Sequence, residues 1–390
     1  MFVEERTTAG GIRRIAYIDG LRALAVLAVV AAHIGYYGIT DDTPLRHVLQ
    51  EGAHGVDLFF VLSGFCLAYP TLAKVAATGS TSFDVTDYAG KRLVRIVPPF
   101  YIATALFLML GFVAAFFGHG FGNLILPSNV GEFASPLLFL DGRVPMLNTS
   151  FWTLMVEFRW YFVFPLLLAV WVKSPRAFLA IGIASVVLFE YTRARSVDLG
   201  TLPGFMLGII AADVHIRSHA IDRWALFLTV ISVMVALAVE NGATIPSADR
   251  AFYPWPYQPT ILAWQLAVFF FVVAAGATAP LARILSAKSL IATGVASYSI
   301  YLIHEPLVSF IVAHFHRTML AMAGAGIGAV AAGFAFWAVC ERVFTEGTLK
   351  RPLLATITRQ VRRVFDWFFL GHVIPLSRLE ADSSEIGIAS

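Results

Sequence analysis

Long, nearly uninterrupted runs of apolar residues constrain this chain more than any other feature. A run of about 20 apolar residues, wound as a helix, crosses the hydrocarbon core of a bilayer. The 390 residues contain ten runs that we interpret as candidate helices. They lie near 17–37, 55–73, 98–118, 151–172, 177–191, 201–214, 224–240, 260–279, 290–313 and 319–343. The sequence therefore predicts an all-α fold, a polytopic transmembrane helical bundle of about ten spans.

The composition excludes most other classes of protein. Apolar residues make up 58% of the chain and charged residues only 14%, against about 25% charged in an ordinary soluble domain. There is too little charge to cover the surface of a soluble protein. We therefore exclude a disordered chain, a soluble enzyme and a nucleic-acid-binding protein. The runs are continuous and do not alternate with a period of two, which favours helices over the strands of a membrane barrel.

Lysine and arginine are distributed unevenly along the chain. Nineteen of the 28 basic residues fall in the termini and in the connections on the same side as the termini, and six fall in the opposite connections. Cytoplasmic loops are the ones enriched in basic residues. We therefore expect both termini in the cytoplasm, as an even number of spans requires. The expected location is the inner (cytoplasmic) membrane of a bacterium.

Three parts of the chain differ in composition. We expect a cytoplasmic N-terminal segment at 1–14, a transmembrane domain at 15–345 and a cytoplasmic tail at 346–390. Residues 353–370 of the tail interleave basic and aromatic side chains, which predicts an amphipathic helix lying on the lipids of the inner membrane surface. The last dozen residues have the composition of a disordered terminus.

The two cysteines, Cys66 and Cys340, both lie in apolar runs. Neither has another Cys or a His at the spacing of metal ligands, so the sequence predicts no disulfide framework and no metal site.

The first predicted span carries three ionisable residues, Asp19, Arg22 and His33. Such residues are costly inside a bilayer and are functional candidates. Arg22 and His33 are eleven residues apart, which is close to three helical turns, so they share one face. Asp19 is three residues before Arg22 and can pair with it. A histidine titrates near neutrality and suits the role of a general base. The alternatives are that Arg22 only anchors the helix at the membrane surface and that His33 only packs against another helix.

Other predicted spans bring Asp57, Glu157 and His304 to a similar depth. We expect these residues to meet His33 in the outer half of the bundle, where a carboxylate would orient the imidazole and raise its basicity. The alternative is that Glu157 only pairs with Arg159 or Arg342 and that Asp57 only caps its helix.

On the cytoplasmic side, Lys91, Arg92 and Arg95 come just before Pro98-Pro99. Arg92 and Arg95 share a face if this stretch is helical, and two guanidinium groups together bind phosphate oxygens well. The alternative is a topological signal or binding of lipid headgroups.

Five motifs in order give the chain a family resemblance. They are YIDGLRALAVLAVVAAHIG, GVDLFFVLSGF, KRLVRIVPPFY, FWTLMVEFRWYFVFP and SYSIYLIHEP. From about residue 14 to 345 the chain resembles acyltransferase family 3, a family of integral-membrane O-acyltransferases. Arg22 and His33 match its arginine–histidine signature, and Arg92 and Arg95 match its paired arginines. Further characteristic positions match Ser63-Gly64-Phe65, Glu157 and His304.

The resemblance implies an enzyme that takes an acyl group, usually acetyl, from a cytoplasmic acyl-CoA. It attaches the group to a hydroxyl of a carbohydrate or lipid-linked glycan. The donor is a substrate, and no permanently bound cofactor is expected. The nearest different class is a proton-coupled transporter, in which the buried Asp, Arg, His and Glu residues form a proton relay.

The resemblance also gives each candidate residue a role. His33 would deprotonate the acceptor hydroxyl, and Glu157 or Asp57 would orient His33. Ser63 or a backbone N–H would stabilise the oxyanion. An acyl-histidine intermediate is the competing mechanism. The donor-binding residues would be Arg22, Lys91, Arg92 and Arg95, and the supporting residues Asp19, Tyr301 and His304.

Overall fold

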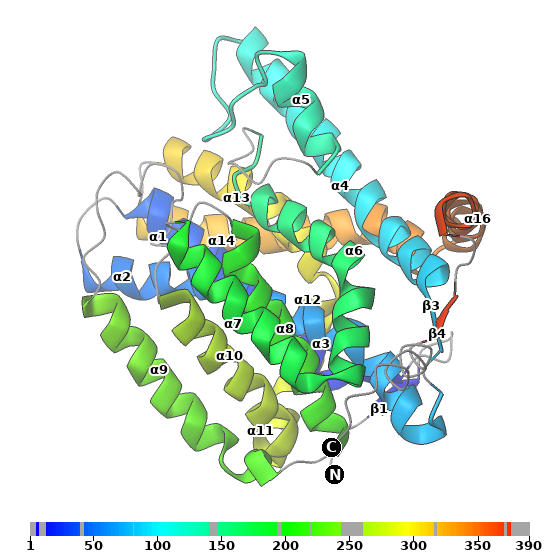
Figure 1. The fold of residues 1–390 in the computed structure, drawn as a ribbon. Coiled ribbons are helices and arrows are strands. Elements are labelled where there is room, and N and C mark those ends of the chain that lie inside the picture. Colours follow the sequence, from blue (N-terminus) through cyan, green and yellow to red (C-terminus); the bar gives the residue numbers. More distant parts are fainter. Residues whose placement is uncertain are drawn as a thin grey trace, which may run out of the picture.

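The computed structural model describes residues 5–7, 13–39, 43–80, 82–139, 147–192, 197–217, 220–242, 260–315, 318–369 and 373–375. Nearly all of them are helical, as expected for an all-α membrane protein (Figure 1). The longer helices are α1 (Ala16–Gly38), α3 (Gly55–Thr78), α4 (Val85–Phe116), α6 (Phe151–Lys173), α7 (Pro175–Tyr191), α8 (Val197–Arg217), α9 (Ala225–Gly242), α10 (Thr260–Ala277), α13 (Ser297–His314), α14 (Met319–Phe336) and α16 (Lys350–Phe369).

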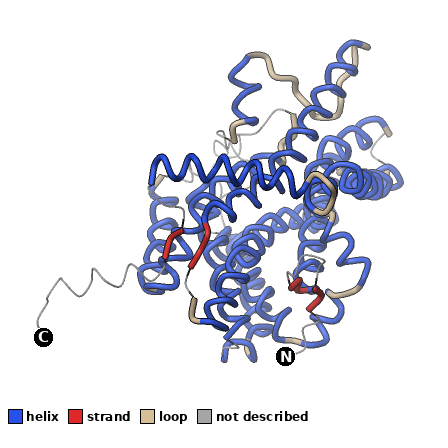
Figure 2. The backbone as a smooth tube through the Cα atoms, turned by 90° about the vertical axis from the view of Figure 1, so that its right-hand side faces the viewer, coloured by secondary structure: helices blue, strands red, loops and turns tan. Residues whose placement is uncertain are grey.

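The remaining elements are short. The short helices are α2 (Pro44–Gln50), η1 (Glu51–His54), α5 (Val130–Leu137), η2 (Ala220–Arg223), α11 (Ala279–Leu285), α12 (Lys288–Val295), η4 (Trp337–Glu341) and α15 (Arg342–Thr345). The strands are β1 (Glu5–Thr7), β2 (Arg13–Ile15), β3 (Ser82–Asp84) and β4 (Val373–Pro375). They form two antiparallel pairs, β1 with β2 and β3 with β4, in two separate places (Figure 2).

Each of the ten predicted segments coincides with helix, but not every segment has the length of a span. Six helical stretches of the described chain are long and apolar enough to cross a membrane. Two further pairs are bent, α10 with α11 by 99° and α12 with α13 by 73°, and raise the number to eight if each pair crosses once. The apolar helices α7 and α9 are shorter. The structure thus gives six to eight candidate spans in place of ten, and the side on which the termini lie stays a prediction.

Helix α4 begins earlier than the sequence predicts. Asp84 caps it, because its side chain accepts hydrogen bonds from the N–H groups of Thr86 at 3.0 Å and Asp87 at 2.9 Å. Partial burial acts to raise the pKa of Asp84, but these hydrogen bonds lower it overall. Pro98 and Pro99, which we interpreted as the start of the span, lie inside this helix. The basic stretch before them is therefore helical.

Helices α3 and α8 approach each other unusually closely. A Cβ atom added at Gly64 would lie 2.0 Å from the carbonyl oxygen of Phe205, and one at Gly208 would lie 2.1 Å from that of Val61. Only glycine fits at these two positions, as in other membrane helices that pack backbone to backbone. This contact fixes the part of α3 that contains Ser63, the residue before Gly64.

Residues Lys350–Phe369 of the tail form helix α16, which lies beside α4 (Figure 1). Thr358 packs on Gly90, and Arg362 Nη2 lies 3.8 Å from Asp84 Oδ2. Its place on a membrane surface stays a prediction. Most of the predicted N-terminal segment and the predicted disordered end of the tail lie outside the described residues.

Candidate functional site

Three of the four predicted donor-binding residues line one cavity of about 90 Å³. Arg22 enters it from α1, and Arg92 and Arg95 enter it from α4. We name this space the arginine cavity. Glu157 is the one carboxylate in its wall, so the lining carries more positive than negative charge.

Two carboxylates outside the cavity wall, Asp19 and Glu341, act on both Arg22 and Arg95. The charges of Arg22 and Arg95 act on each other. Arg92 lies over the ring of Tyr88, with 5.9 Å between the guanidinium carbon and the ring centroid. Its Nε is buried and has no hydrogen-bond acceptor within the described part of the chain. A buried donor without an acceptor is costly, and an anion in the cavity would supply the acceptor.

Lys91, the fourth predicted donor-binding residue, lies elsewhere. Its Nζ pairs with Asp87 Oδ2 at 2.6 Å, one turn back on α4, and both side chains are about half exposed. Residues three apart share a helix face, but Lys91 precedes Arg92 by one position and therefore points about 100° away from it. The structure does not bring Lys91 to the cavity.

Glu157 and Ser63 meet each other but do not meet His33. The hydroxyl of Ser63 donates to Glu157, and so does that of Tyr161. Both Ser63 and Glu157 line the arginine cavity. The alternative pairing with Arg159 does not occur either, because Arg159 binds Asp198 through two nitrogens, Nε at 2.9 Å and Nη2 at 3.1 Å.

His33 is paired with His304 deep in the bundle, where both rings are buried. His33 Nδ1 lies 2.9 Å from the carbonyl oxygen of Val29 and 3.3 Å from His304 Nε2. His304 Nδ1 lies 2.8 Å from the carbonyl oxygen of Tyr301. A carbonyl only accepts, so each neutral ring carries its proton on Nδ1. The lone pair of His33 therefore resides on Nε2.

A second cavity of about 270 Å³, which we name the histidine cavity, is lined by His33. The oxygen of Ser150 lies 3.5 Å from His33 Nε2, at the long limit of a hydrogen bond. Aromatic side chains make up much of the remaining wall. They are Tyr36, Tyr37, Trp152 and Tyr301. The unprotonated nitrogen of His33 is thus placed beside a space that admits a small polar group.

Tyr301 lines both cavities. Its hydroxyl lies 2.6 Å from Thr153 Oγ1 and donates to the carbonyl oxygen of Ser150 at 3.1 Å. These two bonds hold the ring between the arginine cavity and the histidine cavity. Tyr301, which the resemblance gave a supporting role, thus borders both cavities, as does Val56.

Two other predicted residues do not line either cavity. Asp57 accepts a hydrogen bond from His54 Nδ1 at 2.9 Å, at the start of α3. Asp19 is buried on α1, and its charge acts on Arg22. The prediction that Asp57 or Glu157 orients His33 is not what the structure shows, since the Val29 carbonyl and His304 fill that place.

Sequence reasoning gave Glu305 no role. It is fully buried next to His304 and accepts hydrogen bonds from Tyr37, from the side chain of Asn123 and from the N–H of Thr149 at 3.1 Å. Its charge acts on His33. The adjacent His304 was a signal for it, but Asn123 lies in an irregular segment that only the fold brings here.

The comparisons with known proteins agree with one another. The sequence model of a family described as an acyltransferase domain matches residues 15–341. The peptidoglycan O-acetyltransferase OatA of Listeria monocytogenes is 25% identical over 339 residues, which are 78% of this chain and 51% of that protein. The O-acetyltransferase OatA of Staphylococcus aureus is 23% identical over 324 residues, 76% of this chain and 51% of that protein. The chain spans about half the length of these relatives. No solved structure matches it.

Proposed function

The chain belongs to the acyltransferase-domain family, and from this premise we propose that it is a membrane O-acyltransferase. It transfers an acyl group, acetyl in the first instance, from a cytoplasmic acyl-CoA to a hydroxyl of a glycan. The multi-pass helices and the bacterial relatives support a bacterial membrane protein, and we place it in the cytoplasmic membrane.

The position of His33 Nε2 carries this proposal. The nitrogen has a lone pair, because the Val29 carbonyl takes the proton-bearing side of the ring, and it lines the histidine cavity. A general base needs an unprotonated atom within hydrogen-bond reach of the hydroxyl that it serves.

The reaction follows from that placement. The acceptor hydroxyl gives its proton to His33 Nε2 while its oxygen attacks the thioester carbonyl. The tetrahedral intermediate then collapses, the C–S bond breaks, and the imidazolium returns the proton to the CoA thiolate. In the competing mechanism Nε2 itself attacks the thioester, and the acyl group passes through acyl-His33 to the acceptor.

The arginine cavity supplies the donor side of the proposal. Its excess of positive charge and the buried Nε of Arg92 suit the phosphate groups of CoA. We propose that the thioester reaches His33 past Tyr301 and Val56, the two residues that line both cavities. All three arginines, Arg22, Arg92 and Arg95, lie in the first half of their helices. We propose that both helices, α1 and α4, begin on the cytoplasmic side of the membrane.

The histidine cavity supplies the acceptor side. Its tyrosines and Trp152 combine apolar ring faces with a few polar groups, which is the usual lining of a site for a small organic ligand. The two relatives are named as O-acetyltransferases, one of them of peptidoglycan. We therefore propose a cell-wall glycan as the first acceptor to test.

Labelled acetyl-CoA tests the function directly. Membranes containing the chain are incubated with it, with and without purified peptidoglycan fragments, and the glycan is analysed for an alkali-labile acetyl ester. We expect label in the glycan only when the chain and the donor are both present. Proton or solute flux in sealed vesicles without any acyl transfer would instead identify a transporter.

A further inference from the structure

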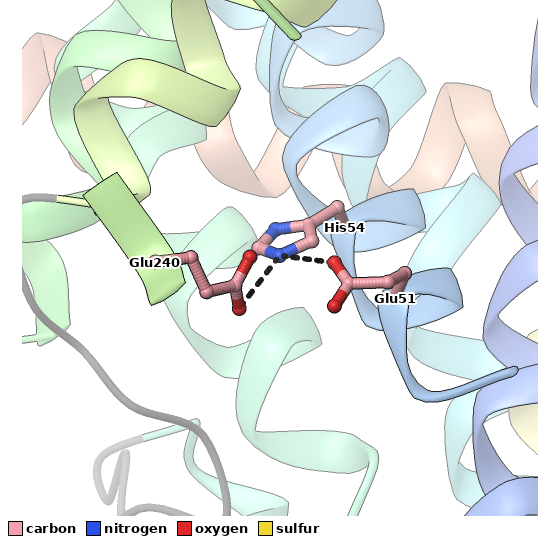
Figure 3. Close-up of side chains that lie close together, drawn as sticks. All are labelled: Glu51, His54 and Glu240. Carbon is pink, nitrogen blue, oxygen red and sulfur yellow. Dashed lines mark ion pairs between the residues drawn. The ribbon is translucent and has the colours of Figure 1, made fainter. Parts of the chain in front are cut away.

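A histidine and two glutamates lie together outside both cavities. Glu51 and His54 come from η1 and Glu240 comes from α9, and one ligand atom of each lies within 4.8 Å of the others (Figure 3). We name this the Glu–His–Glu cluster. His54 Nε2 is 3.7 Å from Glu51 Oε2 and 3.8 Å from Glu240 Oε1.

The ring of His54 is held in one orientation by groups outside the cluster. Its Nδ1 lies 2.9 Å from Asp57 Oδ2, so Nε2 is the nitrogen that faces the glutamates. The indole of Trp264 stacks on the imidazole, with 4.2 Å between centroids and 17° between planes. The same indole donates to Glu240 Oε2 at 3.0 Å, which fixes the carboxylate of Glu240 next to His54.

The carboxylate of Glu51 is incompletely hydrogen-bonded. Glu51 Oε2 is buried and has no hydrogen-bond donor among the described residues. The charges of Glu51 and Glu240 act on each other. Asp57 adds a third carboxylate on the far side of His54. Protonated His54 offsets one of these three negative charges, and His47, one turn before Glu51, also acts on Glu51. A divalent cation between the glutamates would offset two.

We propose that the Glu–His–Glu cluster binds one divalent metal ion of the Zn²⁺ class. One imidazole nitrogen and two carboxylate oxygens are a ligand set that Zn²⁺ accepts, with a fourth position left for water. Ligands about 2.0–2.1 Å from a tetrahedral ion lie roughly 3.3 Å apart. The two measured distances from His54 Nε2 are longer by only about 0.4–0.5 Å, which side-chain rotation supplies. The Asp57–His54 bond is the carboxylate–histidine contact found behind metal-bound imidazoles.

The ion would join distant parts of the fold. It would tie α9 to η1, just before α3, although His54 and Glu240 are 186 positions apart in the sequence. The cluster also adjoins the histidine cavity. Ala53, next to His54, lines that cavity, and Tyr36 lines it within range of the charges of Glu51 and Glu240. The ion would therefore fix one wall of the histidine cavity without entering it.

Metal binding by the purified full-length chain tests this site. The protein, free of any affinity tag and stripped with a chelator, is titrated with Zn²⁺ in detergent by calorimetry and by competition with a chromophoric chelator. We expect one tight Zn²⁺ per chain and a higher unfolding temperature on binding. Co²⁺ in the same site should give the visible absorption of a low-coordinate ion.

Isosteric variants separate a metal site from an ion pair. Glu240→Gln should weaken Zn²⁺ binding at least tenfold while the protein stays monodisperse. Asp57→Asn should weaken it about tenfold through loss of ring orientation. Glu132→Gln, an acidic residue of α5 outside the cluster, is the matched control and should bind as the parent does. Absence of saturable binding, or equal affinity of the parent and Glu240→Gln, would show that the cluster is only an ion pair of protonated His54.

Discussion

At the residue scale, the availability of a lone pair decides what His33 does. A neutral histidine carries one proton on one of two nitrogens, and the acceptor nearest to each nitrogen chooses between them. Here a carbonyl one turn back on α1 and the ring of His304 both lie at Nδ1. The unprotonated nitrogen is consequently Nε2, which lies 3.5 Å from the Ser150 oxygen, and both residues line the histidine cavity. Asp57 binds His54, and Glu157 binds Ser63 and Tyr161, so neither predicted carboxylate is placed at this ring.

Replacement of His33 by alanine tests its role. We expect His33→Ala to lower acyl transfer by about 10²–10⁴-fold, the usual loss on removal of a general base. His314→Ala, in an exposed histidine of α13, is the control and should keep parental activity. The measurement is the initial rate of label transfer from acetyl-CoA at equal amounts of folded protein. Parental turnover by His33→Ala would remove the central base from the mechanism.

Replacing Arg92 and replacing its neighbour Lys91 should have different effects on KM for acetyl-CoA. Arg92→Ala removes a charge-assisted contact to the donor phosphates, worth about 1.5–3 kcal/mol, so KM for acetyl-CoA should rise about 10–100-fold with a smaller change in kcat. Lys91→Ala should change KM less than about twofold, because Lys91 pairs with Asp87 on the surface. Steady-state kinetics of the two variants decides the matter. An equal effect of both would contradict the assignment of the arginine cavity to the donor.

At the element scale, the positions of the helices can be predicted from the sequence, but some helix ends and bends cannot. The ten apolar runs are visible to any hydropathy scan, and all are helical. The Asp84 cap begins α4 well before its proline pair, and prolines within a membrane helix are tolerated when neighbouring groups satisfy the backbone. The bends between α10 and α11 and between α12 and α13 came only with the fold.

The close contact of α3 with α8 gives a prediction for stability. Gly64→Ala places a methyl group where the Phe205 carbonyl already lies, and overpacking of this kind costs about 1–3 kcal/mol. Gly182→Ala in α7 is the matched control. Its Cβ would meet Met206 at an ordinary 3.5 Å, so it should be neutral or slightly stabilising. Unfolding by SDS in mixed micelles measures both, and equal midpoints would show that α3 and α8 can separate at little cost.

At the scale of the whole molecule, the fold places a cationic space and a neutral, aromatic space on two sides of one tyrosine. The residues that line them come from α1, α3, α4, α6 and α13, which are spread over most of the chain. Because one cavity is cationic and the other is lined by His33, we expect the two substrates of the proposed reaction to enter separately. That arrangement suits an enzyme whose donor and acceptor are in different compartments.

Sealed vesicles test this arrangement and the predicted orientation together. Inside-out vesicles expose the cytoplasmic face, so externally added acetyl-CoA should support transfer in them. Sealed right-side-out vesicles should transfer nothing until they are permeabilised, because the charged donor does not cross the bilayer. The label in the glycan is compared before and after permeabilisation. Transfer in intact right-side-out vesicles would place the arginine cavity on the outer face.

The fold class, the family resemblance and the shared helix faces could all be predicted from the amino-acid sequence. Those features depend on local periodicity, so Arg22 with His33 and Arg92 with Arg95 follow from spacing along one helix. Which helices face each other became known from the folded structure alone. It brought His304, and not Glu157 or Asp57, to His33, and it placed Glu240 beside His54. Such contacts depend on how helices cross and where they bend, and no pattern within a single helix encodes them.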